Sequence, residues 1–302
     1  MSYNPSPETA AILDRALAYV QSVPYAVTAR WVFYRLLQDG YLSVKSDYKR
    51  LLGYLSKARK EFYGEWRPDT LADDTRAAVV RGDGFLTGQD WIDALAKQTR
   101  CHRDRWRTQL RYVEVWFEAA AMTSQFQFHS NENIPLLAFH GDVSIPEKWK
   151  AATRLVERWR GARKPIYILY YGDFDKKGLE IPLSAERDLR LFMAVDLMVK
   201  MLRAGASKAS SQVESLQMRS AMVFRRVGIN EEHIAQYNLP ENPERPGTYQ
   251  WEGVPDDAAQ ELIGEANDLL NLAAFGVEEV REDEITRQFR THLDGLHIVE
   301  PK

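Results

Sequence analysis

The chain has 302 residues, 45% of them apolar and 27% charged, and a net charge of −3, which is typical of a folded protein of about two domains with no general attraction to nucleic acid. Its single cysteine, Cys101, excludes an internal disulfide and a thiolate metal cage, and its six histidines show no ligand spacing, so we expect no zinc site. No stretch reaches the ~18 apolar residues of a membrane span and no secretory signal opens the sequence, which predicts a cytoplasmic protein with no membrane partner.

The first 70 residues have the pattern of three short helices followed by a hairpin. Apolar residues recur every three or four positions over residues 7–23, which predicts a helix. Thr28 is a natural N-cap for a second helix that ends near Gly40, and a third helix is predicted over residues 46–62. Residues 63–70 then carry the aromatic, Gly and Pro residues typical of a short hairpin.

This order predicts a winged helix-turn-helix domain, which we place with a helical connector in residues 1–105. Residues 1–110 hold 17 Lys and Arg against 13 Asp and Glu, so this third of the chain is the better candidate for contacting phosphates. Lys49, Arg50 and Lys57 of the third helix are the expected DNA contacts. A three-helix bundle with a solvated cationic face fits the same pattern equally well.

From residue 111 the hydrophobic pattern changes to strands that alternate with helices. Strands are predicted over residues 112–117, 134–140 and 166–171, with a helix over residues 146–159 before the last of them. The fold class is therefore α/β, with a mostly parallel sheet flanked by helices in a second domain of residues 106–302. In such sheets, ligands bind beyond the carboxyl ends of the strands.

Two of these strands end in acidic residues. Glu118 follows the first, and Asp173 and Asp175 follow the third, between Gly172 and Gly178. Three converging carboxylates would repel one another, so a divalent cation is their natural partner, and all-oxygen ligands favour Mg²⁺ or Mn²⁺. The alternative is that these acids only cap the helices that follow, where the helix dipole favours negative charge.

This pattern resembles the TOPRIM domain, in which a glutamate follows one strand and the motif D-x-D-x-x-G follows a later one. Residues 173–178 match that motif, whereas Ala119 replaces the lysine that follows the glutamate in many relatives. The resemblance implies a magnesium site that assists phosphoryl transfer on DNA. Lys176 and Lys177, beside the acidic pair, are placed to meet phosphates.

A second informative feature is Arg30 with Tyr34, four residues apart on the predicted second helix. This spacing puts the two side chains on one face, so the guanidinium can reach a phosphate that the phenol approaches. A phenol with a pKa of ~10 needs about 4 kcal/mol of activation to ionise at neutral pH. The alternatives are a core aromatic for Tyr34 and a surface salt bridge for Arg30.

Arg-x-x-Phe-Tyr at residues 30–34, followed by TOPRIM, resembles the A subunit of topoisomerase VI and the meiotic double-strand-break transesterases. Residues 227–243 resemble a segment of short prokaryotic and phage-borne members, which implies a nucleoid-associated protein of a prokaryotic or phage-infected cell. In this family the second aromatic is the nucleophile, which assigns that role to Tyr34 and a supporting one to Arg30.

The resemblance further implies a homodimer around double-stranded DNA, where Tyr34 of one chain meets the three acids of the other. Each tyrosine would then leave a 5′-phosphotyrosyl link at a double-strand break. The chain has no G-x-x-x-x-G-K-[ST] loop, so strand passage would require a separate ATPase subunit. Two alternatives are a TOPRIM nuclease that uses metal-activated water and a non-catalytic DNA-binding protein.

Overall fold

The computed structural model of the protein describes residues 3–43, 45–72, 87–139 and 143–296. By their contacts the residues form two compact units. The first consists of Met1–Thr75 and Tyr112–Leu269, and the second of Arg76–Arg111 and Leu270–Lys302. The expected domain boundary between residues 105 and 106 falls inside the second unit.

The three predicted N-terminal helices are confirmed as α1 (Pro7–Ser22), α2 (Ala29–Gln38) and α3 (Lys45–Lys60). Thr28 caps α2 as expected, because its hydroxyl accepts a hydrogen bond from the backbone of Trp31 at 3.3 Å. The apolar faces of the helices form a shared core. Its fully buried side chains include Leu13, Trp31, Leu36, Leu51 and Leu55.

The expected hairpin over residues 63–70 is wrong, because this segment forms successive turns and contains no strand. Trp66 anchors it with a side chain that is 1% exposed. Local bonds satisfy the backbone instead of a second strand: the Trp66 N–H donates to the Tyr63 carbonyl at 2.9 Å, and the Arg67 guanidinium donates to the Gly64 and Trp66 carbonyls. The described N-terminal region thus consists of three helices followed by turns, and the predicted winged helix-turn-helix is not confirmed.

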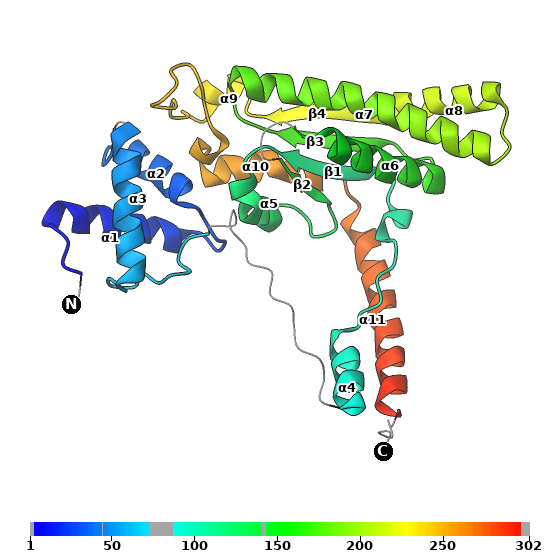
Figure 1. Ribbon diagram of the computed structural model, residues 1–302, viewed down its shortest axis with the longest axis horizontal. Coiled ribbons are helices and arrows are strands. Elements are labelled where there is room, and N and C mark those ends of the chain that lie inside the picture. The colour runs from blue at the N-terminus through cyan, green and yellow to red at the C-terminus, as the bar shows by residue number, and fades with distance from the viewer. Residues whose placement is uncertain (1–2, 44, 73–86, 140–142, 297–302) are drawn as a thin grey trace. The chain divides into compact units, whose positions relative to one another are not determined.

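The α/β fold is confirmed by a parallel four-stranded sheet with the order β2-β1-β3-β4 (Figure 1). Its strands are β1 (Tyr112–Phe117), β2 (Leu136–Ala138), β3 (Ile166–Tyr171) and β4 (Met222–Gly228). The first three were predicted, although β2 is shorter than expected. β4 was missed because arginines interrupt its apolar residues, as is common for a strand at the edge of a sheet.

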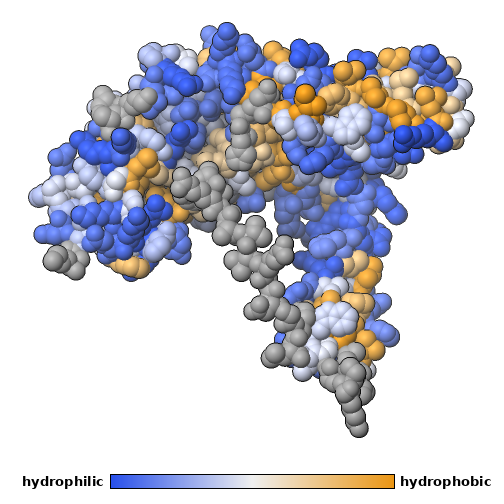
Figure 2. All heavy atoms as spheres, in the orientation of Figure 1, coloured by the Kyte–Doolittle hydropathy of each residue, from blue (hydrophilic) through white to orange (hydrophobic). Residues whose placement is uncertain are grey.

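Helices cover both faces of this sheet, with α7 and α8 on one side and α5 and α10 on the other (Figure 1). The described elements of the region are α5 (Thr123–His129), α6 (Ile145–Ala162), α7 (Lys176–Arg203), α8 (Lys208–Ala221), α9 (Glu231–Gln236) and α10 (Asp256–Asn267). α7 and α8 pack against each other and still expose apolar side chains, seen as orange spheres in Figure 2. The exposed apolar side chains of the two helices are Leu179, Leu183, Leu191, Val195, Val199, Leu202, Val213 and Leu216.

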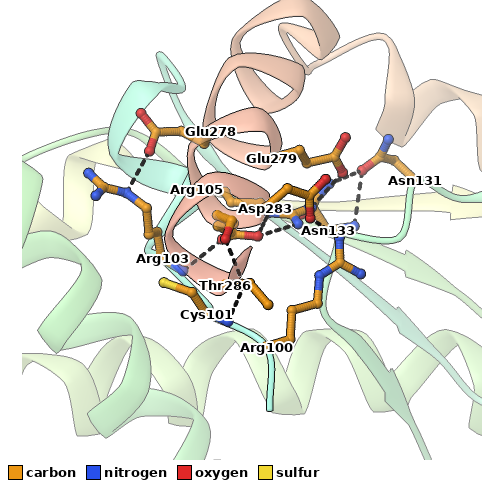
Figure 3. A network of polar contacts seen from close by, with 11 residues as sticks. Arg100, Cys101, Arg103, Arg105, Asn131, Asn133, Glu278, Glu279, Asp283 and Thr286 are labelled. Carbon is orange, nitrogen blue, oxygen red and sulfur yellow. Dashed lines mark hydrogen bonds and ion pairs between the residues drawn. The ribbon is translucent and has the colours of Figure 1, made fainter. Parts of the chain in front are cut away.

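The second unit pairs α4 (Gly88–Gln98) and a short 3₁₀ helix (Arg105–Thr108) with α11 (Leu272–Asp294). Ion pairs link the two segments: Arg103 binds Glu278 at 2.9 Å and Arg105 binds Glu279 at 2.7 Å (Figure 3). None of the described helices combines the length and the apolar character that crossing a bilayer requires.

Candidate functional site

The acidic residues that the sequence singled out lie at one edge of the sheet. β1 and β3 end together because Phe117 pairs with Tyr171, and the backbone N–H of Glu118 donates to the Tyr171 carbonyl at 2.9 Å. Glu118 therefore lies beside Gly172, at the start of the loop that carries Asp173 and Asp175. The predicted convergence of the two strand ends is confirmed.

Two glycines give the Glu118 carboxylate its space. A Cβ atom at Gly172 would lie 3.0 Å from the Oε2 atom of Glu118, and one at Gly178 would lie 3.1 Å from it. A Cβ at Gly178 would also come within 2.2 Å of the Asp173 carbonyl oxygen, which no real contact allows. The loop can approach Glu118 only because both positions lack a side chain.

The two aspartates have different partners. Asp175 is the N-cap of α7, since its Oδ1 atom accepts a hydrogen bond from the Gly178 backbone at 2.6 Å. The capping role is thus observed for Asp175. Asp173 accepts a hydrogen bond from the Trp251 backbone at 2.9 Å and has no other side-chain hydrogen bond in the described chain. No three His, Cys, Asp or Glu side chains among the described residues are arranged as a metal-ligand group.

Burial and the repulsion of neighbouring acids raise the pKa of two carboxyl groups of the site, Glu118 and Asp173. Burial and then the charge of Asp175 raise the pKa of Glu118. Burial, followed by the charge of Glu252, raises the pKa of Asp173 to about 8. The negative charge of the cluster is therefore only partly neutralised by nearby cations. A bound divalent cation such as Mg²⁺ would neutralise the rest. The oxygen donors and the glycine cradle fit such an ion.

Glu252 is a fourth acid of the site, which the sequence analysis missed. It lies on a 3₁₀ turn (Trp251–Gly253), is 4% exposed, and burial raises its pKa. Its closest cation is Arg30, with 3.9 Å between Nη1 and Oε1. The only local signal was an acidic residue between apolar neighbours, which is too common to single out without its contacts.

Arg226 on β4 was also missed, and it fixes the shape of the acidic loop. Its guanidinium donates hydrogen bonds to the backbone carbonyls of Gly172, Asp173, Gly178 and Ile229 at 2.7–3.2 Å. Burial lowers its pKa. Because one planar group binds both ends of the loop, Arg226 positions Asp173.

Tyr34 is buried in this structure, with 2% of its surface exposed. Its hydroxyl donates a hydrogen bond to the side-chain oxygen of Gln250, and its ring packs edge-to-face on Phe33. Burial and then the charge of Glu252 raise the pKa of Tyr34, whereas Arg30 acts in the opposite direction. The core-aromatic alternative therefore describes the packing of Tyr34 in this conformation.

Two neighbouring cavities contain the predicted residues, and Arg30 lines both of them. The smaller cavity, of about 290 Å³, contains Tyr34 with Tyr48, Arg245 and Gln250. The larger, of about 640 Å³, is lined by groups of both charges and by small residues. Its charged lining residues are Arg30, Arg59, Glu118, Asp173 and Glu252.

Tyr34 therefore lies within electrostatic reach of Asp173 and Glu252 of its own chain. The family resemblance implies instead that the tyrosine meets the acids of a second chain. Asp175 does not line either cavity, because it is engaged as the cap of α7. The structure thus brings Arg30, Glu118 and Asp173 to one cavity and leaves Tyr34 in the next.

The expected DNA-contacting cations lie on the surface. Lys49, Lys176 and Lys177 are exposed, and Lys57 lies over the ring of Tyr3 at 4.5 Å. Arg50 is hydrogen-bonded to an aspartate of its own helix at 2.9 Å. Four of these five cations therefore face solvent and bind no carboxylate among the residues that the structure describes.

No protein-family model matches the chain, and it matches neither a curated protein nor a solved structure.

Proposed function

We propose that this protein cleaves DNA in a Mg²⁺-dependent transesterification in which Tyr34 is the nucleophile. The observation that carries the proposal is the position of Arg30, which lines both the cavity with Glu118 and Asp173 and the cavity with Tyr34. A phosphate held by Arg30 would thus lie between the phenol and the carboxylates. Phosphoryl transfer requires this placement of a nucleophile, a cation and an acidic metal-binding edge around one phosphorus atom.

Glu118 and Asp173 would hold Mg²⁺, or Mn²⁺, with Asp175 joining them if it releases its cap. The fit rests on their oxygen donors, on the glycine cradle, and on the excess negative charge that raises the pKa of Asp173. The ion, when bound, neutralises the charge that develops on the phosphoryl oxygens. Arg30 supplies a second positive charge to the same phosphate.

In the proposed step the Tyr34 oxygen attacks phosphorus, and the bond from phosphorus to the 3′ oxygen breaks. The phenol loses its proton and the leaving 3′ oxygen gains one, so the products are a 5′-phosphotyrosyl link and a free 3′ hydroxyl. Because Tyr34 is buried and its pKa is raised, it must leave Gln250 and approach Arg30 before it can react.

We further propose that a homodimer acts on double-stranded DNA, with each chain cutting one strand, and that strand passage needs a separate ATPase subunit. Lys49, Arg50, Lys57, Lys176 and Lys177 are the proposed contacts to the DNA backbone. These contacts would place the protein on DNA in the cytoplasm of a prokaryotic or phage-infected cell.

The test is incubation of the protein with supercoiled DNA and Mg²⁺ or Mn²⁺, stopped by denaturant and split into samples with and without protease. The wild type should give linear DNA with protein bound to its 5′ ends. Tyr34→Phe should give neither cleavage nor a covalent adduct, because the ring is kept and only the nucleophilic oxygen is lost. Asp173→Ala should also abolish both, because the cation loses a ligand.

Tyr41→Phe is the matched control, since it removes a phenol hydroxyl from an exposed tyrosine that lines neither cavity. It should retain cleavage and the adduct. Wild-type protein that never forms an adduct, or a Tyr34→Phe variant that still does, would rule out the transesterase.

One observation favours a second candidate, in which water rather than Tyr34 attacks the phosphorus. Tyr34 is 2% exposed and lies in a different cavity from Glu118 and Asp173. A nuclease of this kind should cut DNA equally well as wild type and as Tyr34→Phe, and it should never form the adduct. Asp173→Ala would abolish its activity, so the same experiment separates the two candidates from a non-catalytic DNA-binding protein.

A further inference from the structure

The larger cavity is lined by groups of both charges. Arg30 from α2 and Arg59 from α3 line it together with Glu118, Asp173 and Glu252 from the sheet region, and Arg30 lies 3.9 Å from Glu252. All five residues belong to the same compact unit of a single chain. A cavity that is lined by both cations and acids suits a ligand that carries a negative group and a bound cation.

Arg59 is the unusual member of this cavity. Its Nε atom is buried and makes no hydrogen bond, and within the described chain its guanidinium forms no ion pair. Two other arginines of the same unit are satisfied: Arg35 donates to the Val254 carbonyl at 2.6 Å, and Arg226 donates to four backbone carbonyls. A buried donor without an acceptor is unfavourable, and because Arg59 lines the cavity, a ligand bound there would supply the acceptor.

Arg30 complements Arg59 because it is only weakly engaged. Its side chain is 48% exposed, and its one ion pair, to Glu252, spans 3.9 Å. Two guanidinium groups that line the same cavity can together bind the oxygens of a phosphate, and such charge-assisted bonds are stronger than neutral ones.

We infer that Arg59 and Arg30 form a binding site for a backbone phosphate of DNA, and that the bound phosphate faces the acids of the same chain. The inference deepens the proposed function, because it names the ligand of the cavity and a residue, Arg59, that holds it. It also means that one chain is sufficient to seat the phosphate, without acids from a second chain.

The acids that line the same cavity would repel a bare phosphate, so binding through Arg59 requires a divalent cation. The experiment measures DNA binding rather than cleavage. A short fluorescent duplex is titrated with protein in Ca²⁺, which occupies hard oxygen sites, and in EDTA, over a series of salt concentrations. The variants are Arg59→Gln and Arg59→Lys, with Lys60→Gln as the control, since Lys60 is an exposed neighbour on α3 that does not line the cavity.

In Ca²⁺ we expect Arg59→Gln to weaken binding about tenfold or more, the scale of lost hydrogen bonds between charged groups. The slope of log K against log salt should fall by about 1, as for one lost phosphate contact. Arg59→Lys should bind with intermediate affinity, because it keeps the charge and loses the paired donors. Lys60→Gln should bind within about twofold of wild type, because exposed charges are screened.

The unfolding temperature of Arg59→Gln, measured without ligand, separates a binding role from a structural one. It should equal or exceed that of wild type, because the variant removes a buried donor that has no partner. A variant that unfolds earlier, or that binds DNA as tightly as Lys60→Gln, would overturn the inference.

A parallel arm replaces the duplex with inorganic phosphate and follows the unfolding temperature. If free phosphate stabilises wild type but not Arg59→Gln while DNA binding is unchanged, the site takes a small anion and the assignment to DNA is wrong. Arg59-dependent binding of DNA that is never cut would support the inference and contradict the proposed cleavage. Conversely, an adduct that forms undiminished in Arg59→Gln would contradict the inference alone.

Discussion

At the scale of single residues, Asp173 gives the clearest test of the acidic cluster. Burial and the charge of Glu252 raise its pKa above that of the unfolded chain, so the folded state binds the proton more tightly. Its contribution to stability is fully present below pH 3.8 and is lost as pH rises toward about 8. Asp173→Asn should therefore raise the free energy of unfolding at pH 8, by roughly 1–3 kcal/mol without metal.

Asp175→Asn is the matched control, because Asp175 lies in the same loop and its side chain caps α7. It should leave stability unchanged or lower it by up to about 1 kcal/mol. Thermal or urea unfolding at several pH values in EDTA measures both. If the difference in the free energy of unfolding between Asp173→Asn and wild type does not grow with pH, Asp173 is not destabilised by burial and by neighbouring acids.

Glu118, Asp173 and Asp175 could be predicted as site residues from the sequence, because each follows a predicted strand. Glu252, Arg226 and Arg59 could not be predicted as site residues. Each of these acquires its role from contacts with residues far away in the chain, such as the bonds from Arg226 to the acidic loop. The same holds for the burial of Tyr34, which depends on Gln250.

At the scale of elements, the start of α7 determines whether the acidic loop can close on Glu118. Gly178→Ala should destabilise the protein although alanine is the better helix former, because its Cβ would lie 2.2 Å from the Asp173 carbonyl. We expect a loss of about 1–3 kcal/mol and a smaller rise in unfolding temperature on adding Mg²⁺, since Asp173 is displaced.

Gly264→Ala on α10 is the control, because no atom lies within 4 Å of its added Cβ. It should stabilise the protein by roughly 0.5–1 kcal/mol and leave the Mg²⁺ effect unchanged. Unfolding curves with and without Mg²⁺ measure both variants. Equal behaviour of the two variants would mean that the tight approach at Gly178 is not needed.

Elements with strong local signals were predictable, and those defined by distant partners were not. Capping by Thr28 and the apolar periodicity located α1, α2 and α3, and the alternation after residue 111 located β1 and β3. β4 is defined by its pairing with β3, which the sequence does not reveal. The hairpin prediction was wrong because the turn residues form local backbone hydrogen bonds and need no partner strand. The spacing of apolar residues and the presence of capping or turn residues predict a helix or strand. Which strands pair is decided only in the folded chain.

At the scale of the whole molecule, the second unit is assembled from two segments that are far apart in sequence. The sequence pattern predicts a helical connector for the first segment and a charged final helix for the second. It does not predict that the two segments are in contact. The contact depends on charge: Glu282 of α11 is fully buried and accepts hydrogen bonds from the Arg103 backbone at 2.7 Å and from Arg105. A segment that contains both acidic and basic residues does not show in its sequence which charged residues elsewhere in the chain will form ion pairs with it.

Glu282→Gln should therefore weaken the second unit and leave the acidic cavity intact. Its hydrogen bond with Arg105 lowers the pKa of Glu282, so this stabilisation is present above pH 4.5 and is lost as pH falls through the folded-state pKa, opposite to Asp173. At neutral pH the loss should be about 1–3 kcal/mol. Hydrogen exchange should become faster in α4 and α11 and stay unchanged in β1 and β3, with the Mg²⁺ effect on unfolding retained. Faster exchange in the sheet as well would mean that the two units unfold as one.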